Sequence, residues 1–183
     1  MTDSGRRLTE RILEPTYVQA VRERNLTELR AMREECMEGE TELSFERKLC
    51  QGRIDILNAE LERRDGGQTE IDLVARLPQI LADPGASTGP SDGLPLPERA
   101  PNLSVPRSAD APHRRVEELI AEKTLMRLPE VSSDEIKAII QSLAQHEQSL
   151  SSRRKGLHEV LDVVQAEIVR RYTSGEADPT LAL

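Results

Sequence analysis

The sequence predicts an all-α fold in which two long helices form an antiparallel coiled-coil hairpin with short flanking helices. One observation is the composition, with only 2% aromatic and 32% charged residues, which is typical of long helices and disfavours a sheet-based core. A second is an apolar residue at every seventh position over two separate stretches. A third is that these stretches resemble each other, 107 positions apart. The segment between them is long enough for either orientation. We expect the antiparallel one because it relates the two copies by a single two-fold axis.

The chain is expected to open with a short helical segment over residues 1–24. Apolar spacing places one helical stretch around 8–13 and another around 17–24. Pro15 lies between them and should end the first stretch, because proline has no backbone N–H with which to continue a helix.

The first long helix is expected over residues 25–64. Asn25 is a preferred N-cap residue, and Glu28, three positions later, completes a capping box. The helix should stop at a pair of glycines, Gly66 and Gly67, since glycine is the usual residue just past a helix end.

Residues 65–131 are expected to link the two long helices, with short helices at 70–82 and 114–127. At about 83–113 the composition changes to Pro, Gly, Ser, Ala and Asp, with seven prolines. Such a composition predicts a disordered linker, because it offers too little apolar surface to form a core.

The second long helix is expected over residues 132–172, followed by a C-terminal tail at 173–183. Ser132 and Glu135 repeat the capping box of the first helix.

An internal duplication relates the two long helices, because residues 25–64 align with 132–171 without a gap. One heptad column is apolar throughout in both copies: Leu29, Cys36, Leu43, Cys50, Leu57, Ile136, Leu143, Leu150, Leu157 and Val164. A companion column is apolar toward its ends and charged in its middle, at Glu40, Arg47, Glu147 and Arg154. Charges at core positions are costly to desolvate without a partner, so something must compensate them.

The charged positions belong to a polar stripe that occurs once in each copy. Steps of 4, 3, 4 and 4 residues keep its five members within about 80° on one helical face. In the first copy the members are Glu40, Ser44, Arg47, Gln51 and Asp55. In the second copy they are Glu147, Ser151, Arg154, His158 and Asp162. Packing alone rarely requires this mixture, so two copies predict a site assembled from two equivalent halves.

The residues alone leave two interpretations of the stripe open. In one, its glutamates and arginines form interhelical ion pairs that fix the register of the helices. An antiparallel pair would place Arg47 near Arg154 and Glu40 opposite Asp162, so that like charges meet, although neighbouring Arg and Glu could still pair diagonally. In the other interpretation, a ligand occupies the gap in the apolar seam.

The chemistry of the stripe favours a ligand that contains guanine and phosphate. Arginine can hold phosphate, or the O6 and N7 acceptors of guanine, with two parallel N–H groups. A carboxylate can accept from the N1 and N2 hydrogens of guanine, a donor pair that adenine lacks. Serine, glutamine and histidine can bond to phosphate or ribose oxygens. A two-fold symmetric nucleotide would match a duplicated stripe.

Charge and composition disfavour several classes of protein. The net charge of −8 disfavours direct binding of nucleic acid and suits a protein that covers a basic surface on another protein. No apolar run approaches the roughly 20 residues of a membrane span, and the N-terminus lacks a signal-peptide core. We therefore expect a cytoplasmic protein without membrane association.

The sequence also gives no sign of a redox, metal or catalytic site. Cys36 and Cys50 lie on the apolar column, roughly 21 Å apart along one helix, so they are expected to be core residues and not a disulfide. His113, His146 and His158 do not have metal-ligand spacing, and no nucleophile–base pair is evident. We expect neither a metal site nor an enzyme.

The spacing Glu-x3-Ser-x2-Arg-x3-Gln-x3-Asp resembles the signature of RsiG, the anti-sigma factor family of actinobacteria that is armed by cyclic di-GMP. Residues 40–55 match this signature at all five positions, and residues 147–162 match at four. His158 stands where the family pattern has Gln. An imidazole can still donate or accept one hydrogen bond, and its contact would depend on pH near neutrality.

The resemblance implies that the two stripes hold an intercalated dimer of cyclic di-GMP between two coiled-coil helices. The main guanine and phosphate contacts would be Arg47, Arg154, Asp55 and Asp162. Further hydrogen bonds would come from Ser44, Ser151, Gln51 and His158, and the stripe would be completed by Glu40 and Glu147.

The resemblance also implies a partner. The loaded protein, itself a monomer, would form a 1:1 heterodimer with a WhiG-type sigma factor and keep it from RNA polymerase, which represses the sigma regulon. We expect the sigma contacts on the outer faces of the long helices and on the short segments near 8–24, 70–82 and 114–127. The alternative expectation is a coiled-coil adaptor or scaffold that binds its partner without a ligand.

Overall fold

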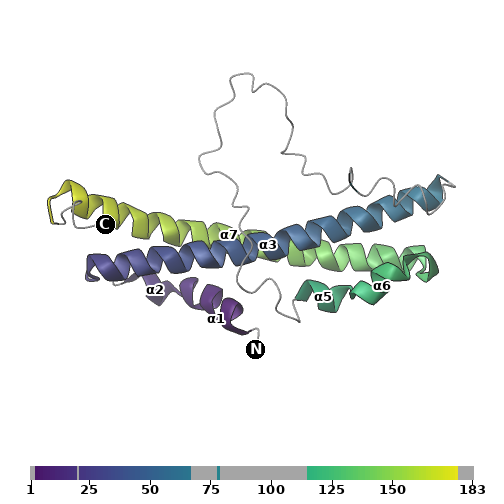
Figure 1. Ribbon diagram of the computed structural model, residues 1–183, viewed down its shortest axis with the longest axis horizontal. Helices are drawn as coiled ribbons and strands as arrows, with labels where there is room; N and C mark the ends of the chain where they lie inside the picture. Colours follow the sequence, from purple (N-terminus) through teal and green to yellow (C-terminus); the bar gives the residue numbers. More distant parts are fainter. Residues whose placement is uncertain (1–2, 20, 67–77, 79–114, 177–183) are drawn as a thin grey trace, which may run out of the picture. The chain divides into compact units, whose positions relative to one another are not determined.

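The protein is all-α in the computed structural model, which describes residues 3–19, 21–66, 78 and 115–176 (Figure 1). Its helices, in chain order, are α1 (Asp3–Ile12), α2 (Pro15–Gln19), α3 (Leu26–Asp65), α5 (Arg115–Leu119), α6 (Glu122–Met126), the 3-10 helix η1 (Leu128–Glu130) and α7 (Ser133–Thr173). The described residues include no strand, which confirms the predicted fold class. Apart from Pro78, the expected helix at 70–82 and the expected disorder at about 83–113 lie outside the described residues.

The described chain divides into two compact units. Unit 1 holds the described residues up to Phe45 and from Ser149 onward, and unit 2 holds those between Glu46 and Gln148. Each unit therefore contains part of α3, part of α7 and two short α-helices (Figure 1).

In unit 1, α3 and α7 run antiparallel. Arg30, near the start of α3, donates a hydrogen bond to Tyr172 Oη at the end of α7. Further along α3, Glu40 accepts a hydrogen bond from Arg154, which lies earlier in α7. Later residues of α3 therefore contact earlier residues of α7, so the two helices run in opposite directions.

In unit 2 the same order holds. Arg64, near the end of α3, donates to Ser133 Oγ at the start of α7 over 3.3 Å. Arg47, earlier in α3, donates to Glu147, which lies further along α7. The predicted antiparallel hairpin is thus confirmed within each unit.

The apolar heptad column forms the core of the hairpin. All ten of its members are at most 2% exposed: Leu29, Cys36, Leu43, Cys50, Leu57, Ile136, Leu143, Leu150, Leu157 and Val164. Both cysteines are unbridged, and burial raises the pKa of the Cys36 thiol to about 11 and that of Cys50 to about 12. They are core residues, as the sequence predicted.

Both long helices begin at the predicted caps. Asn25 Oδ1 accepts from the backbone N–H of Glu28, and Glu28 Oε2 accepts from the backbone N–H of Asn25, which is a complete capping box. Ser132 Oγ accepts from the backbone N–H of Glu135 over 3.2 Å. These bonds satisfy donors that the first turn of each helix leaves unpaired.

The short helices differ from the prediction in their bounds. The stretch expected around 17–24 begins earlier, at Pro15, because proline fits the first turn of a helix, and it ends at Gln19. The single stretch expected over 114–127 is wrong, since the chain forms two helices there, α5 and α6. The break lies at Ala121, whose carbonyl accepts from two following backbone N–H groups and so begins a new helix.

A buried glutamate binds two arginines near the end of α3 in unit 2. Glu60 is 1% exposed and accepts from Arg63 Nε at 2.7 Å and from Arg64 Nε at 2.7 Å. The far nitrogens of Arg64 donate to the carbonyls of Leu128 and Val131, at 2.8 and 2.7 Å. This Glu60 clamp therefore ties the end of α3 to the segment that leads into α7.

The duplicated residues near the end of α7 repeat this arrangement in unit 1. Glu167 is 6% exposed and accepts from Arg170 Nε at 2.9 Å and from Arg171 Nε at 2.8 Å. Arg171 Nη2 then donates to the carbonyl of Arg22, just before α3. Each clamp joins the end of one long helix to the approach of the other.

The clamps predict a loss of stability in acid. Hydrogen bonds from Arg170 and Arg171 lower the pKa of Glu167 from 4.5 to about 2, and those from Arg63 and Arg64 lower the pKa of Glu60. A carboxylate with a depressed folded-state pKa stabilises the fold above its unfolded-state pKa, and this contribution disappears as pH falls through the folded-state value. We expect the temperature at the midpoint of thermal unfolding, followed by circular dichroism, to decrease as the pH is lowered from about 4.5 to about 2. The decrease should be smaller in Glu167→Gln. An equal fall in the variant would contradict this assignment.

Candidate functional site

In unit 1, members of both polar stripes converge on Glu40. Its side-chain Oε1 accepts from Ser44 Oγ at 2.7 Å and from Arg154 Nε at 3.0 Å. His158 Nε2 lies 3.7 Å from the same oxygen. Glu40 is only 7% exposed, and a buried carboxylate needs hydrogen-bond donors to compensate its charge. Both long helices supply such donors.

In unit 2, members of both polar stripes converge on Glu147. Glu147 Oε1 accepts from Arg47 Nη1 at 3.3 Å and from Gln51 Nε2 at 3.2 Å. Here the acceptor comes from α7 and both of these donors come from α3.

The two clusters, called half-sites below, share the same arrangement of contacts. In each, the glutamate of one sequence copy meets the arginine of the other copy and the residue four positions after that arginine. Gln51 fills this last place in unit 2, and His158 fills it in unit 1 at the longer distance. The duplication seen in the sequence is therefore also a duplication of contacts.

Diagonal pairing compensates the charges that were expected to face their like. The sequence placed Glu40 opposite Asp162, but Glu40 pairs with Arg154, and Glu147 pairs with Arg47. The sequence left diagonal Arg–Glu pairing open for an antiparallel hairpin, and both glutamates pair in that way. These are the cross-helix ion pairs that the register-setting interpretation requires.

Both ion pairs remain partly open to solvent. The side chains of Arg47 and Glu147 are 28% and 22% exposed, and that of Arg154 is 31% exposed. Arg47 Nε is also buried without a hydrogen-bond partner among the described residues. The arginines are thus reachable from solvent, and one of them has a donor without an acceptor.

The remaining members of the stripe lie toward solvent. Ser151 is half-buried, and Asp55 and Asp162 are exposed. Each aspartate lies at the edge of its stripe, rotated by about 60° around the helix axis from the glutamate of the same stripe.

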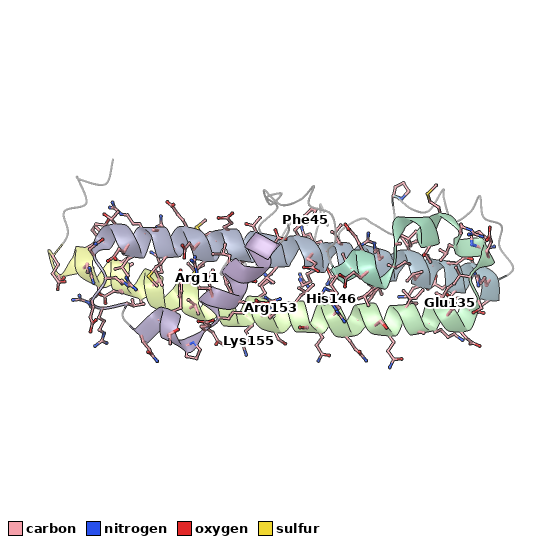
Figure 2. The ribbon with its side chains drawn as sticks, turned by 90° about the horizontal axis from the view of Figure 1, so that it is seen from below. Arg11, Phe45, Glu135, His146, Arg153 and Lys155 are labelled. Carbon is pink, nitrogen blue, oxygen red and sulfur yellow. The ribbon has the colours of Figure 1, made fainter. Side chains whose placement is uncertain are left out.

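In unit 1, α1 packs against the hairpin beside the half-site. Gly39 precedes Glu40 directly, and a Cβ at Gly39 would lie 2.9 Å from Leu157 Cδ1 and 3.3 Å from Thr9 Cγ2 of α1. Arg153, the neighbour of Arg154, donates to Thr9 Oγ1 at 2.8 Å (Figure 2). Since one residue turns the helix by about 100°, α1 contacts a different face from the polar stripe.

In unit 2, a second cross-helix bond takes the place of that contact. His146 Nε2 lies 2.8 Å from Glu46 Oε1, and the two side chains are 12% and 16% exposed (Figure 2). Each is the chain neighbour of a half-site residue, Glu147 and Arg47 respectively. These two supporting residues were not predicted from the sequence. The sequence feature that could have indicated them is the heptad column three positions after the apolar core residues. Glu46 and His146 lie in this column of the two helices.

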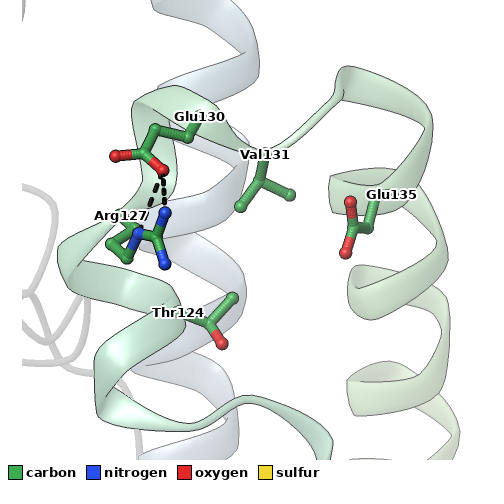
Figure 3. A pocket seen from close by; sticks show the side chains of 5 residues that line it. All are labelled: Thr124, Arg127, Glu130, Val131 and Glu135. Atoms are coloured by element: carbon green, nitrogen blue, oxygen red, sulfur yellow. Dashed lines mark hydrogen bonds and ion pairs between the residues drawn. The ribbon is translucent and has the colours of Figure 1, made fainter.

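A shallow pocket in unit 2 lies apart from the stripe. Figure 3 shows the five residues that line it, Thr124, Arg127, Glu130, Val131 and Glu135, none of which belongs to the stripe. Its arginine is already paired with Glu130, as the dashed lines mark.

Two further properties hold for the part of the chain that the structure describes. It contains no group of three or more His, Cys, Asp or Glu side chains arranged to hold a metal ion. None of its helices combines the length and the apolar character needed to cross a bilayer.

A comparison with known protein families finds a match over most of the chain. The sequence model of a family described as RsiG-like matches residues 15–81 and 122–182, which include both long helices and both polar stripes. No curated protein matches the chain.

Proposed function

This chain belongs to the RsiG-like family, and on that premise we propose that it is an anti-sigma factor controlled by cyclic di-GMP. Family membership suggests the anti-sigma role and implies a sigma factor as partner. The proposal adds that the stripes of α3 and α7 bind cyclic di-GMP as an intercalated dimer. It adds further that the loaded protein forms a 1:1 complex with a WhiG-type sigma factor in the cytoplasm and keeps it from RNA polymerase. The role is one of binding and not of catalysis.

The observation that carries the proposal is the pair of equivalent half-sites. Each combines an arginine, a carboxylate and a further hydrogen-bonding group at the seam between two helices, where a coiled coil normally places apolar residues. Two such clusters suit a ligand with two equivalent ends.

The ion pairs within the half-sites are compatible with ligand binding. A guanidinium carries five N–H donors, and Arg154 uses Nε for Glu40 while Arg47 uses Nη1 for Glu147. The remaining donors can hold a phosphate or the O6 and N7 of guanine. The glutamates would then hold the arginines in the orientation needed for binding, as supporting hydrogen bonds do for ligand-contacting side chains in general.

The other stripe residues would complete recognition of the base. The exposed carboxylates of Asp55 and Asp162 can accept from guanine N1 and N2, which adenine cannot offer. Gln51 and His158 lie beside the paired glutamates and can donate to phosphate or ribose oxygens, while Ser44, whose hydroxyl hydrogen bonds to Glu40, can accept from a ribose hydroxyl. Because these groups come from both helices, bound nucleotide would favour one hairpin geometry, and a partner that recognises this geometry would bind the loaded form.

A second candidate function is a coiled-coil adaptor that binds its partner without nucleotide. The observation that favours it is that Glu40 and Glu147 already have arginine partners across the seam. In that case the stripes would fix the register of the helices, and ligand would have no effect on partner binding.

Partner binding with and without nucleotide separates the two candidates. We expect a purified WhiG-type sigma factor to co-elute with this chain in size-exclusion chromatography when cyclic di-GMP is present, and to elute separately without it. Cyclic di-AMP is the matched control, because its adenines lack the N1–H and N2–H donors. Co-elution that is equally strong without any nucleotide would support the adaptor instead.

A further inference from the structure

We propose that Arg33 is an additional ligand-binding residue of the half-site in unit 1, where it contacts an anionic group of the nucleotide. The proposal rests on the function proposed above and identifies a residue outside the repeated signature. It also predicts that the two half-sites differ in their affinity for phosphate.

Arg33 lies on α3 at a position that places it on the face of the polar stripe. Arg33 precedes Glu40 by seven residues, which turns the helix by about 700° and brings Arg33 to within about 20° of Glu40. It therefore belongs to the same column as Glu40 and lies on the face that carries the polar stripe.

The register of unit 1 shows which part of α7 lies level with Arg33. Glu40 contacts Arg154, so moving seven residues back along α3 corresponds to moving about seven forward along antiparallel α7, to the level of Leu161 and Asp162. Arg33 thus stands level with Asp162, a member of the second stripe. An arginine at this level adds a cationic side chain one heptad from Glu40.

Arg33 also carries an unsatisfied donor. Arg33 Nε is buried and has no hydrogen-bond partner among the described residues, which is also true of Arg47 Nε on the same face. Buried N–H groups are nearly always paired in native proteins, so an unpaired one needs an explanation. An anionic ligand at the half-site of unit 1 would supply an acceptor for Arg33. Arg53 Nη1 shares this property, but Arg53 lies on the column that carries Glu46, away from the stripe.

The duplication provides an internal comparison for this residue. The position equivalent to Arg33 in the second copy is Ile140, which cannot donate a hydrogen bond. The half-site of unit 1 therefore has a second arginine that the half-site of unit 2 lacks. We infer that unit 1 binds the phosphate-bearing part of the ligand more tightly than unit 2.

Calorimetric titration of cyclic di-GMP into Arg33→Ile tests the inference. This variant gives unit 1 the residue that unit 2 already has, and we expect its affinity to fall by about tenfold, the effect of losing one charge-assisted hydrogen bond. Arg33→Gln removes the charge while it keeps an amide donor, and it should lose nearly as much. Arg22→Gln, an exposed position before α3, removes the same charge outside the stripe and should bind like the wild type.

The outcomes separate this inference from the proposed function. If the wild type binds cyclic di-GMP and both Arg33 variants bind it with the same affinity, Arg33 has no role in binding, while the proposed function still holds. A fall of the same size in Arg22→Gln would show a general effect of charge and would also overturn it. If the wild type itself binds no cyclic di-GMP, both the inference and the proposed function fail.

Discussion

Replacing Arg47 with alanine is expected to abolish the binding of cyclic di-GMP, with a loss in affinity of about 100-fold or more, and with it the capture of the sigma factor. Arg47 is the stripe arginine of unit 2, and its side chain is partly exposed and carries a buried donor without an acceptor. Removing it would delete both a charge and a bidentate contact, each of which contributes strongly to phosphate and guanine recognition. Equilibrium dialysis with labelled nucleotide measures the affinity.

Helical content should survive this substitution. The Arg47–Glu147 pair is more than one-fifth exposed on both sides, and ion pairs of this kind contribute only about 0–1 kcal/mol to stability. Lys137→Ala, which removes an exposed charge from α7 in the same unit, is the matched control and should bind nucleotide normally. If Arg47→Ala keeps full nucleotide affinity and a normal circular dichroism spectrum, Arg47 does not bind nucleotide. Its pairing with Glu147 would then serve only to fix the register of the helices.

Replacing Glu60 with alanine is expected to destabilise the hairpin by about 2–3 kcal/mol, and so to lower the midpoint of thermal unfolding by roughly 5–10 °C. Glu60 is 1% exposed and accepts three hydrogen bonds from Arg63 and Arg64. Without the carboxylate, two guanidinium groups that are only 15% and 20% exposed lose their counter-charge. Removing one member of a buried pair is costly because the other charge stays desolvated.

The comparison for this variant is an exposed glutamate on the same helix. Glu38→Ala should change stability by no more than about 0.5 kcal/mol, because surface substitutions away from such networks have small effects. Differential scanning calorimetry of both variants gives the two midpoints. Equal midpoints would mean that the Glu60 clamp contributes nothing beyond an ordinary surface charge.

The hairpin could be predicted from the sequence because its determinants are local and repeated. The heptad column from Leu29 to Leu57 depends only on spacing, and every member is buried. The caps at Asn25 and Ser132 depend on residues three positions apart. Such signals need no knowledge of which segments meet in space.

The details of the half-sites could not be predicted in the same way. The sequence left open whether glutamate and arginine pair diagonally across the seam, because helix periodicity does not determine which side chains of facing helices meet. The contact between α1 and Gly39 requires the tertiary position of a short helix. The break at Ala121 was missed for a similar reason, because the helical pattern there continues through the turn.

The two halves of the duplicated chain share their binding residues and differ in what supports them. In unit 1 a short helix packs beside Glu40 through Gly39, whereas in unit 2 His146 bonds directly to Glu46. A change that loosens α1 should therefore affect the half-site of unit 1 and leave that of unit 2 intact. This difference makes it possible to perturb one half-site at a time.

Calorimetric titration of cyclic di-GMP into the wild-type chain shows whether the paired polar stripes form a nucleotide receptor. We expect saturable heat at micromolar nucleotide, with two nucleotides bound per chain and no comparable heat from cyclic di-AMP. A helical, correctly folded sample that gives no heat with cyclic di-GMP at these concentrations would contradict it.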